Sequence, residues 1–342
     1  MRYQKKYQLS KQSNMNYRTL GKTGFNISEV SLGTWQLGGK WGAGFDEELA
    51  ERTLKNAIDE GINFFDTADV YKDRKSEAIV GQVVRNQSER IYVATKCGRR
   101  ISPHVNEEYQ PDVLRGFVED SLRNTGLDTI DLIQLHCPPT EVYYRPEIFE
   151  VFERLREEGK IQHLGVSVEK VEEGLKAIEF PNVASVQIIF NMFRQRPSEL
   201  FFREAARRNV GIIVRVPLAS GMLTGKFDRS TTFEEGDHRH FNRDGSAFDK
   251  GETFAGIPYE EGIQATRKLK AVFPDLDNLA PAALRWILMF PEVSCTIPGA
   301  SKVEHVKSNA RASEFPRLTQ AQIDAVNEIY EEHIKQHVHQ RW

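Results

Sequence analysis

Four side chains that together could carry out acid–base chemistry occur in the first half of the chain: Asp66, Tyr71, Lys96 and His136. A tyrosine has a pKa of ~10, so it protonates a developing alkoxide poorly at neutral pH unless a nearby cation stabilises its phenolate. Lys96 could supply that cation, and Asp66 could orient and neutralise the ammonium. His136 could hydrogen-bond the substrate oxygen and position the reacting group.

Each of these residues also has an ordinary structural explanation. An aspartate at the end of a strand is usually the N-cap of the next helix, and a lone histidine is most often a satisfied core residue. Tyr71, five residues after Asp66, could simply hold its hydroxyl in water. However, charged groups that follow three successive apolar runs must find partners or shift their pKa values. We therefore predict that the four residues form one site.

Eight short apolar runs alternate with amphipathic stretches, a pattern typical of strands and helices around a parallel sheet. We expect strands at 30–33, 63–67, 91–96, 131–136, 161–167, 184–187, 211–216 and 293–298. Apolar residues at three- and four-residue spacing predict helices at 46–60, 76–86, 111–125, 147–158, 169–179, 197–208 and 280–290. The pattern thus predicts an α/β fold, a (β/α)8 TIM barrel with its functional face at the C-terminal ends of the strands.

Several segments lie outside this alternation. Residues 17–28 predict an N-terminal β-hairpin that could plug one end of the barrel. Residues 227–258 lack periodicity and predict a long loop that could act as a lid. We expect two extra C-terminal helices, at 302–310 and 318–336. Residues 1–14 are polar and basic and predict a flexible tail, which leaves 15–342 as a single barrel domain.

The composition narrows the class of protein. The 342 residues include 46 basic and 49 acidic side chains, so nucleic acid is not an expected partner. No run approaches the ~18 apolar residues of a membrane span, and the first 14 residues lack a secretory signal. The chain has only three cysteines, and none is closely spaced with another, which argues against a disulfide framework. We therefore expect a reducing, cytoplasmic location. The oligomeric state is left open.

From about residue 17 to 312 the chain resembles the aldo-keto reductase superfamily. FDTADVY at 65–71 resembles the family's DTAxxY motif, ATKCG at 94–98 carries the matching Lys96, and LIQLHCPP at 132–139 carries the matching His136. The resemblance implies an enzyme that uses NADPH to reduce an aldehyde or ketone to an alcohol, with Tyr71 as proton donor. The small-molecule carbonyl substrate would lie against Tyr71, His136 and Trp35.

The resemblance also assigns residues to the cofactor. GVS at 165–167 and VQIIFN at 186–191 are similar to the segments that hold the nicotinamide carboxamide, although Val168 stands where many members have Asn. RVPLASGMLTGKF at 215–227 is similar to the pyrophosphate segment, and IPGASKVEHVKSNARA at 297–312 to the adenosine end. The implied cofactor residues are Gly33, Thr34, Asp66, Ser167, Gln187, Arg215, Pro217, Leu218, Gly221, Leu223, Lys226, Gly299, Ser301, Lys302, His305 and Asn309.

Three features of the cofactor and substrate regions have more than one interpretation. Ser301 and Lys302 would contact a 2′-phosphate, which favours NADPH over NADH, although NADH stays possible. Phe190 or Phe193 could stack on the nicotinamide ring or belong to the core. Lys72 and Arg74 replace glycines that the family often has after the tyrosine, and such a basic rim could suit an anionic or polyhydroxy substrate or be merely solvated.

The residues support other functions less well. A Rossmann enzyme is not supported because no G-x-G-x-x-G follows a strand, and GMLTGKF lacks the spacing of a P-loop. His136 and Cys137 have no accompanying metal-binding motif, so we expect no metal. The remaining alternative is a nicotinamide-binding redox sensor or regulatory subunit that has the same fold and little turnover.

Overall fold

Eight parallel strands form one sheet in which each strand pairs with its neighbour in the chain, as the sequence predicts. The structure is a computed structural model that describes residues 14–39 and 44–342, so the expected tail falls almost entirely outside the described residues. The strands are β3 (Leu32–Gly33), β4 (Phe64–Asp66), β5 (Tyr92–Cys97), β6 (Ile130–His136), β7 (Ile161–Ser167), β8 (Val183–Ile189), β9 (Gly211–Arg215) and β10 (Val293–Thr296).

The sheet closes on itself between its first and last strands. Parallel bridges join Val30 to Thr296 and Gly33 to Gly299. A Cβ atom added at Gly33 would lie 2.7 Å from the carbonyl oxygen of Ile297, so this glycine permits the close approach of the two edges. The closed (β/α)8 barrel is therefore confirmed.

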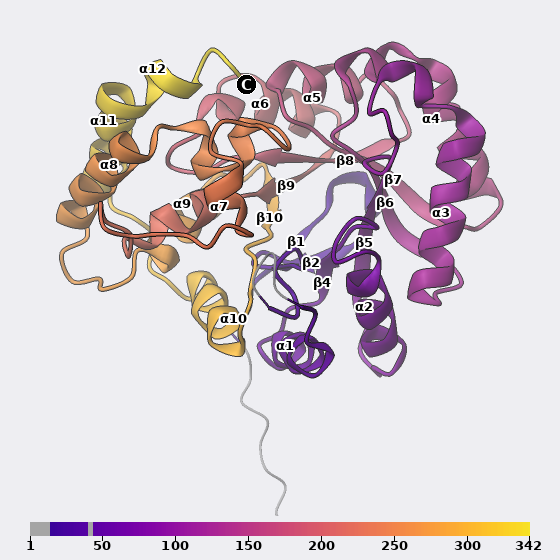
Figure 1. Cartoon of the computed structure of the whole chain (residues 1–342), viewed down its shortest axis with the longest axis horizontal. Helices are drawn as coiled ribbons and strands as arrows, with labels where there is room; N and C mark the ends of the chain where they lie inside the picture. Colours follow the sequence, from indigo (N-terminus) through magenta and orange to yellow (C-terminus); the bar gives the residue numbers. More distant parts are fainter. Residues whose placement is uncertain (1–13, 40–43) are drawn as a thin grey trace, which may run out of the picture.

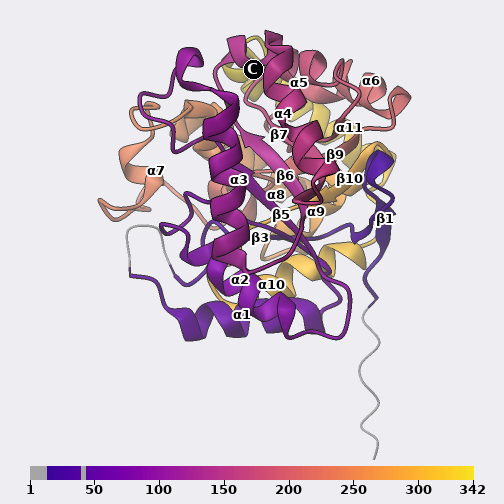
Figure 2. The same cartoon turned by 90° about the vertical axis from the view of Figure 1, so that its right-hand side faces the viewer.

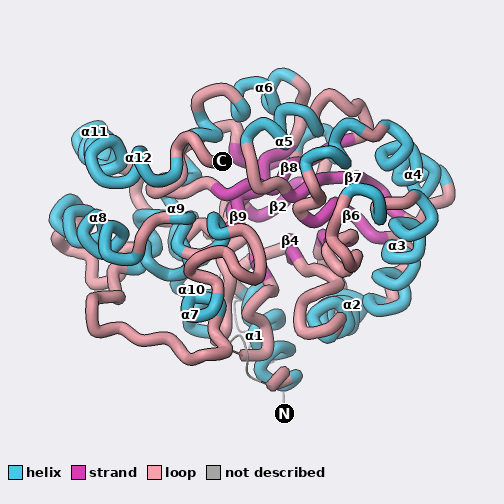
Figure 3. The backbone as a smooth tube through the Cα atoms, turned by 45° about the horizontal axis from the view of Figure 1, so that its top comes forward, coloured by secondary structure: helices cyan, strands magenta, loops and turns pink. Residues whose placement is uncertain are grey.

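Helices surround the strands on the outside of the barrel (Figures 1 and 3). They are α1 (Glu47–Asp59), α2 (Lys75–Arg85), α3 (Pro111–Thr125), α4 (Pro146–Glu157), α5 (Val171–Ala177), α6 (Phe201–Arg207), α7 (His238–Phe241), α8 (Tyr259–Val272), α9 (Ala280–Leu288), α10 (Val303–Ala310), α11 (Gln320–Ile329) and α12 (Lys335–Val338). Helix α8, which follows the long loop, was not predicted from the sequence. No helix in the described residues is both long and apolar enough to cross a membrane.

The N-terminal hairpin closes the bottom of the barrel, as predicted. Strands β1 (Tyr17–Thr19) and β2 (Asn26–Ser28) pair antiparallel. From the hairpin, Leu20, Phe25 and Ile27 are buried among inward-facing barrel residues, which include Phe64 and Leu132. Figure 2 shows β1 and helix α7 of the long loop on opposite sides of the molecule. The hairpin thus blocks one end and leaves the C-terminal ends of the strands for the site.

Polar side chains form a layer directly above this apolar plug. Side chains two residues apart on a strand share a face, so Asp66 follows Phe64, Lys96 follows Ala94, and Gln134 follows Leu132. The interior is narrow at this level. An added Cβ at Gly165 would lie 2.4 Å from the Ser185 hydroxyl and 3.2 Å from Cγ of Gln134. The barrel therefore collects its buried polar groups in one place.

The long loop after β9 is better ordered than its composition predicts. It contains α7 and the short 3-10 helices η6 (Lys250–Glu252) and η7 (Phe254–Gly256). Asn242 is fully buried within it, where its side chain donates to Thr253 at 3.1 Å and accepts from two backbone amides. A buried amide with several partners holds a loop in one shape. The loop is thus a packed element rather than a flexible strand connection.

The loop between β4 and α2 contains a buried carboxylate. Asp69 is 1% exposed, and no side chain among the described residues hydrogen-bonds either of its carboxylate oxygens. Burial raises its pKa to about 7, and the nearby carboxylate of Glu77 adds to the shift, while Arg100, the backbone N–H of Val70 and Arg74 oppose it. The unfolded chain releases this proton near pH ~4. The folded chain therefore holds an extra proton between about pH 4 and 7, and the stability contributed by Asp69 falls as the pH rises through that window.

We predict that Asp69→Asn makes the protein less sensitive to pH. The variant should gain on the order of 2–4 kcal/mol relative to the parent between pH 5 and pH 8, because the cost of an ionised buried carboxylate is removed. Urea unfolding midpoints at the two pH values measure this, and Asp73→Asn, an exposed residue of the same loop, is the control. An unchanged pH slope in Asp69→Asn would show that Asp69 is ionised throughout.

Candidate active site

Three of the four residues expected to perform chemistry meet at the buried ammonium of Lys96. Its Nζ donates to Asp66 Oδ1, to the backbone oxygen of Thr67 at 2.9 Å and to the Tyr71 hydroxyl at 3.3 Å. Lys96 and Asp66 are 1% and 2% exposed. The structure thus brings Lys96, Asp66 and Tyr71 together as the sequence predicts, and it does so without water access to the ion pair.

The second oxygen of Asp66 is held by two glutamines. Gln134 Nε2 donates to Oδ2 at 3.0 Å, and Gln187 Nε2 donates to the same atom at 2.7 Å. Gln187 also donates to Gln134 Oε1 at 3.1 Å. From the sequence, Gln187 was assigned to the cofactor and Gln134 was not identified. Gln134 lies two residues before His136, which places the two side chains on the same inward face of the strand.

Burial and charge act in opposite directions on these groups. Burial alone would lower the pKa of Lys96, but Asp66 and the Tyr71 hydroxyl offset this, and the pKa is raised. Burial raises the pKa of Tyr71, and the ammonium of Lys96 lowers it by a smaller amount. The expected effect of Lys96 on Tyr71 is present, yet the burial effect is larger. In this structure Tyr71 is therefore a protonated phenol beside a cation, which is the state of a proton donor.

His136 completes the group from the end of β6. Its ring centroid lies 6.0 Å from that of Tyr71, with the rings nearly perpendicular. Burial lowers its pKa well below the usual value, and Lys96, Arg99 and Arg215 lower it further. Nδ1 is buried without a hydrogen-bond partner among the described residues. A neutral imidazole can donate one hydrogen bond to a substrate oxygen without adding charge.

The segment after Tyr71 adopts a conformation that normally favours glycine. Lys72, Asp73 and Arg74 have φ angles of 50°, 49° and 69°, which lie in the left-handed region. The loop thus holds a backbone conformation that favours glycine while it carries the basic side chains of Lys72 and Arg74.

The residues expected at the nicotinamide end of the cofactor lie together around β7, β8 and β9. The Ser167 hydroxyl lies 3.5 Å from Cys137 Sγ, and Val168 fills the next position as a fully buried side chain. Arg215 Nη2 donates to the backbone oxygen of Val168 at 3.1 Å. On the other side of the barrel, Thr34 Oγ1 donates to the backbone oxygen of Asp66 at 3.1 Å. Phe190 packs among Phe202, Trp286 and Phe290, so it belongs to the core.

The two segments expected to bind the rest of the cofactor converge at the other end of the rim. Gly221 has a φ of 95° within the short helix η5 (Ala219–Thr224), beside Ser220, which is also left-handed. The backbone N–H of Gly221 donates to the Leu218 oxygen at 2.9 Å, so this turn is held by its own hydrogen bonds. Lys226 and Lys302 are exposed, and both lower the pKa of His305 after the larger effect of burial. Both lysines therefore lie within electrostatic range of His305.

The remaining predicted cofactor residues have defined places. Ser301 Oγ lies 3.4 Å from His305 Nδ1, and Asn309 Nδ2 donates to the backbone oxygen of Gly299 at 3.4 Å. Lys302 is the N-cap of α10 and makes no side-chain capping bond. Pro217 and Leu223 are buried and Leu218 is half-buried, which leaves their backbone as the part that could contact a ligand.

The long loop returns to the barrel beside Trp35, the residue expected to line the substrate site. The Trp35 ring lies 4.7 Å from that of His238 and 6.1 Å from that of Phe248. Burial lowers the pKa of His238 to about 4, so it is neutral at physiological pH. The loop thus packs against Trp35, and its role as a lid stays a prediction. No sequence signal identified His238 or Phe248.

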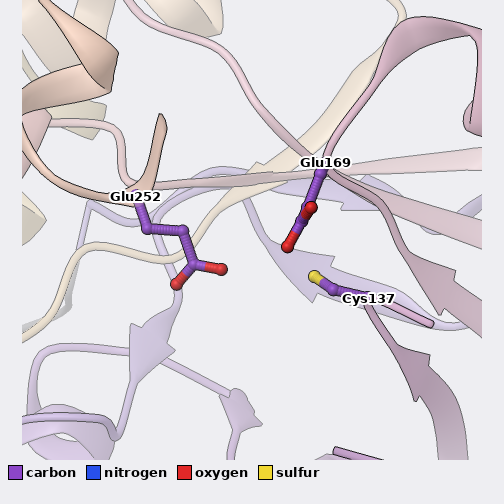
Figure 4. A group of neighbouring side chains, drawn as sticks. All are labelled: Cys137, Glu169 and Glu252. Atoms are coloured by element: carbon purple, nitrogen blue, oxygen red, sulfur yellow. The ribbon is translucent and has the colours of Figure 1, made fainter. Parts of the chain in front are cut away.

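A second polar cluster lies at the same rim. Ligand-type atoms of Cys137, Glu169 and Glu252 lie within 4.8 Å of one another, and their side chains converge in Figure 4. The sequence analysis identified neither glutamate. Arg215 Nη1 lies 3.2 Å from Glu252 Oε1, and Nη2 lies 3.5 Å from Cys137 Sγ. A guanidinium therefore already supplies the positive charge, which argues against a metal as the partner of these groups.

A separate hollow of about 640 Å³ opens near the hairpin end of the barrel. Its lining includes Lys22, Phe149, His163 and Phe180 and none of the predicted site residues. The groups with reactive chemistry lie at the opposite strand ends. We therefore place the candidate active site around Lys96 and not in this hollow.

Comparison with known proteins agrees with this geometry. The Aldo/keto reductase family model matches residues 29–331. The uncharacterized oxidoreductase YqkF of Bacillus subtilis (strain 168) is 31% identical over 95% of this chain and 98% of its own. A putative voltage-gated potassium channel subunit beta of Schizosaccharomyces pombe is 28% identical, over 92% and 93% of the two chains. The solved glycerol dehydrogenase AKR11B4 from Gluconobacter oxydans has a TM-score of 0.76 at 29% identity, over 93% and 96%. With its family match across nearly the whole closed barrel, this protein belongs to the aldo/keto reductase family.

Proposed function

We propose that this oxidoreductase reduces an aldehyde or ketone to an alcohol with NADPH, and that Tyr71 donates the proton. The observation that carries the proposal is the position of the Tyr71 hydroxyl, 3.3 Å from an ammonium that is itself buried against Asp66. A phenol alone is too weak an acid for this task, and the adjacent cation stabilises the phenolate as the proton leaves. The same arrangement runs in reverse for alcohol oxidation.

The remaining groups of the site have complementary roles in this reaction. Bound NADPH would supply the hydride. His136, neutral because of burial and its cationic neighbours, donates a hydrogen bond to the carbonyl oxygen and aligns it with the Tyr71 hydroxyl. Asp66 and its two glutamines keep the ammonium of Lys96 fixed, so little reorganisation is needed as charge develops.

The preference for NADPH rests on the basic end of the cofactor segments. Lys302 begins α10 and is exposed, and Lys226 lies close enough to act on the same histidine. A 2′-phosphate placed there would meet two ammonium groups and the positive end of a helix. NADH lacks that phosphate and would gain nothing from these contacts.

A regulatory or redox-sensing role is the second candidate function. It is favoured by three similar proteins whose names identify them as putative or probable voltage-gated potassium channel subunits beta. The complete group of Asp66, Tyr71, Lys96 and His136 favours an enzyme, because a sensor needs cofactor binding but no proton donor. Measured NADPH consumption with a panel of aldehydes separates the two, since a sensor would bind NADPH with negligible turnover.

We predict that Tyr71→Phe lowers kcat for carbonyl reduction by about 10²–10⁴-fold, the usual contribution of a positioned general acid. The affinity for NADPH should change by less than about threefold, because the ring remains and only the hydroxyl is lost. Stopped-flow turnover and NADPH fluorescence titration measure the two quantities. Undiminished turnover in the variant would assign the proton transfer to another group.

We also predict that Lys302→Ala weakens NADPH binding by about tenfold and NADH binding by less than about twofold. The reason is the loss of one charge-assisted contact, worth ~1.5 kcal/mol, to a phosphate that only NADPH carries. Lys307→Ala, an exposed lysine later in the same helix, is the matched control and should affect neither cofactor. Equal losses for both cofactors would remove Lys302 from the phosphate site.

A further inference from the structure

We propose that Arg99, Glu169, Arg215 and Glu252 form a subsite that binds a hydroxyl group of the substrate, so that the preferred substrates are hydroxyaldehydes or hydroxyketones. We call these four residues the charged subsite. The inference rests on the proposed carbonyl reduction and adds the class of substrate to it.

The charged subsite is assembled at the functional end of the barrel from four different segments. Arg99 follows β5, Glu169 follows β7, Arg215 ends β9, and Glu252 ends η6 in the long loop. The thiol of Cys137 lies among them, and its carboxylate neighbours face it from two sides (Figure 4). Cys137 directly follows His136, which places their Cα atoms about 3.8 Å apart. The subsite therefore adjoins the group that would orient the carbonyl.

Electrostatic effects place the charged subsite beside the reacting groups as well. Burial and Lys96 have the largest effects in lowering the pKa of His136. Arg99 and Arg215 have the next largest effects in the same direction. Glu252 contributes to raising the pKa of Tyr71, after the larger effects of burial and Asp66. The charged subsite thus lies within electrostatic range of both Tyr71 and His136.

The two arginines have donors that the protein leaves unused or weakly used. Arg215 belongs to the segment expected at the nicotinamide end of the cofactor, so it would lie where cofactor and substrate meet. Its Nε is buried and has no hydrogen-bond partner among the described residues, although Nη1 and Nη2 make contacts at 3.1 to 3.5 Å. Arg99 Nη1 reaches Glu169 Oε1 and the backbone oxygen of Cys137 only at 3.5 Å each. An unpaired buried donor is costly, so a ligand that accepts hydrogen bonds here is favoured.

The two glutamates supply acceptors at the same place. Glu252 is 14% and Glu169 is 22% exposed, so both remain open on one side. Burial raises the pKa of Glu169 to about 7, and the carboxylates of Asp249 and Glu252 raise it further, while Arg215 and Arg99 oppose the shift. An ionised carboxylate has about four acceptor positions, and the contact of Glu169 with Arg99 is long. Donors and acceptors are therefore available side by side.

Among common substituents, a hydroxyl group fits this combination best. It accepts a hydrogen bond from an arginine and donates one to a glutamate at the same time. A carboxylate would use the arginines but would face two glutamates, and an alkyl chain would cover four charged groups without replacing their hydrogen bonds. The structure thus favours a neutral polar substituent near the carbonyl.

Three aldehydes of equal chain length test the proposal on the intact enzyme with NADPH: glyceraldehyde, lactaldehyde and propanal. We expect kcat/KM to be at least tenfold higher for lactaldehyde than for propanal, because a site built to bond a hydroxyl rejects the analogue that lacks it. Succinic semialdehyde tests the carboxylate alternative. If the parent prefers propanal or succinic semialdehyde to both hydroxyaldehydes, the charged subsite is overturned while the proposed reductase function stands.

Substitutions in the charged subsite test whether its residues cause a preference for hydroxyaldehydes. Arg99→Met and Glu252→Gln should each reduce the lactaldehyde-to-propanal ratio of kcat/KM at least fivefold, and thermal melting checks that each variant folds. Arg100→Met, at the neighbouring position and outside the charged subsite, should leave the ratio unchanged. Equal ratios in the parent and both subsite variants would overturn the proposal. Failure of the parent to oxidise NADPH with any aldehyde would instead overturn the proposed function on which it rests.

Discussion

The buried ammonium of Lys96 is the constraint on which the rest of the site depends. Taking an isolated charge out of water costs several kcal/mol, and removing one partner of a buried pair typically costs about 3–5 kcal/mol. Lys96 avoids this cost because its ammonium donates hydrogen bonds to Asp66, to the Thr67 backbone oxygen and to the Tyr71 hydroxyl. Gln134 and Gln187 then satisfy Asp66. The site is therefore a fully hydrogen-bonded buried network whose outermost member is the hydroxyl of Tyr71, the proposed proton donor.

This network needs the closed barrel, because its members come from β4, β5, β6 and β8. The register pairs Lys96 with Gln134 and Asp66 with Ala94, so a slip of one residue would turn the charged groups away from the interior. Below them, the hairpin supplies Leu20, Phe25 and Ile27 as an apolar floor. Water is thereby excluded from one side of the ion pair, and low polarity strengthens each interaction in it.

Local patterns explain what could be predicted from the sequence. Apolar runs located the strands, and the DTAxxY resemblance located Asp66 and Tyr71, because both signals involve residues near one another in the chain. Helix α8 was missed because it directly follows the aperiodic loop, and Gln134 was missed because a neutral amide on a strand has no distinctive signal. The net pKa of Tyr71 could not be foreseen either, since burial depends on packing from distant segments.

The two polar groups at the rim differ in how completely they are satisfied, and this difference separates chemistry from specificity. Around Lys96, hydrogen bonds occupy the ammonium and both oxygens of Asp66, which suits a step that must occur the same way for every substrate. In the charged subsite, contacts are longer and Arg215 Nε has no partner among the described residues. Its members also come from loops and strand ends, where sequence can vary without disturbing the barrel. The protein thus keeps a rigid reaction centre beside a polar surface that retains hydrogen-bonding groups for a ligand.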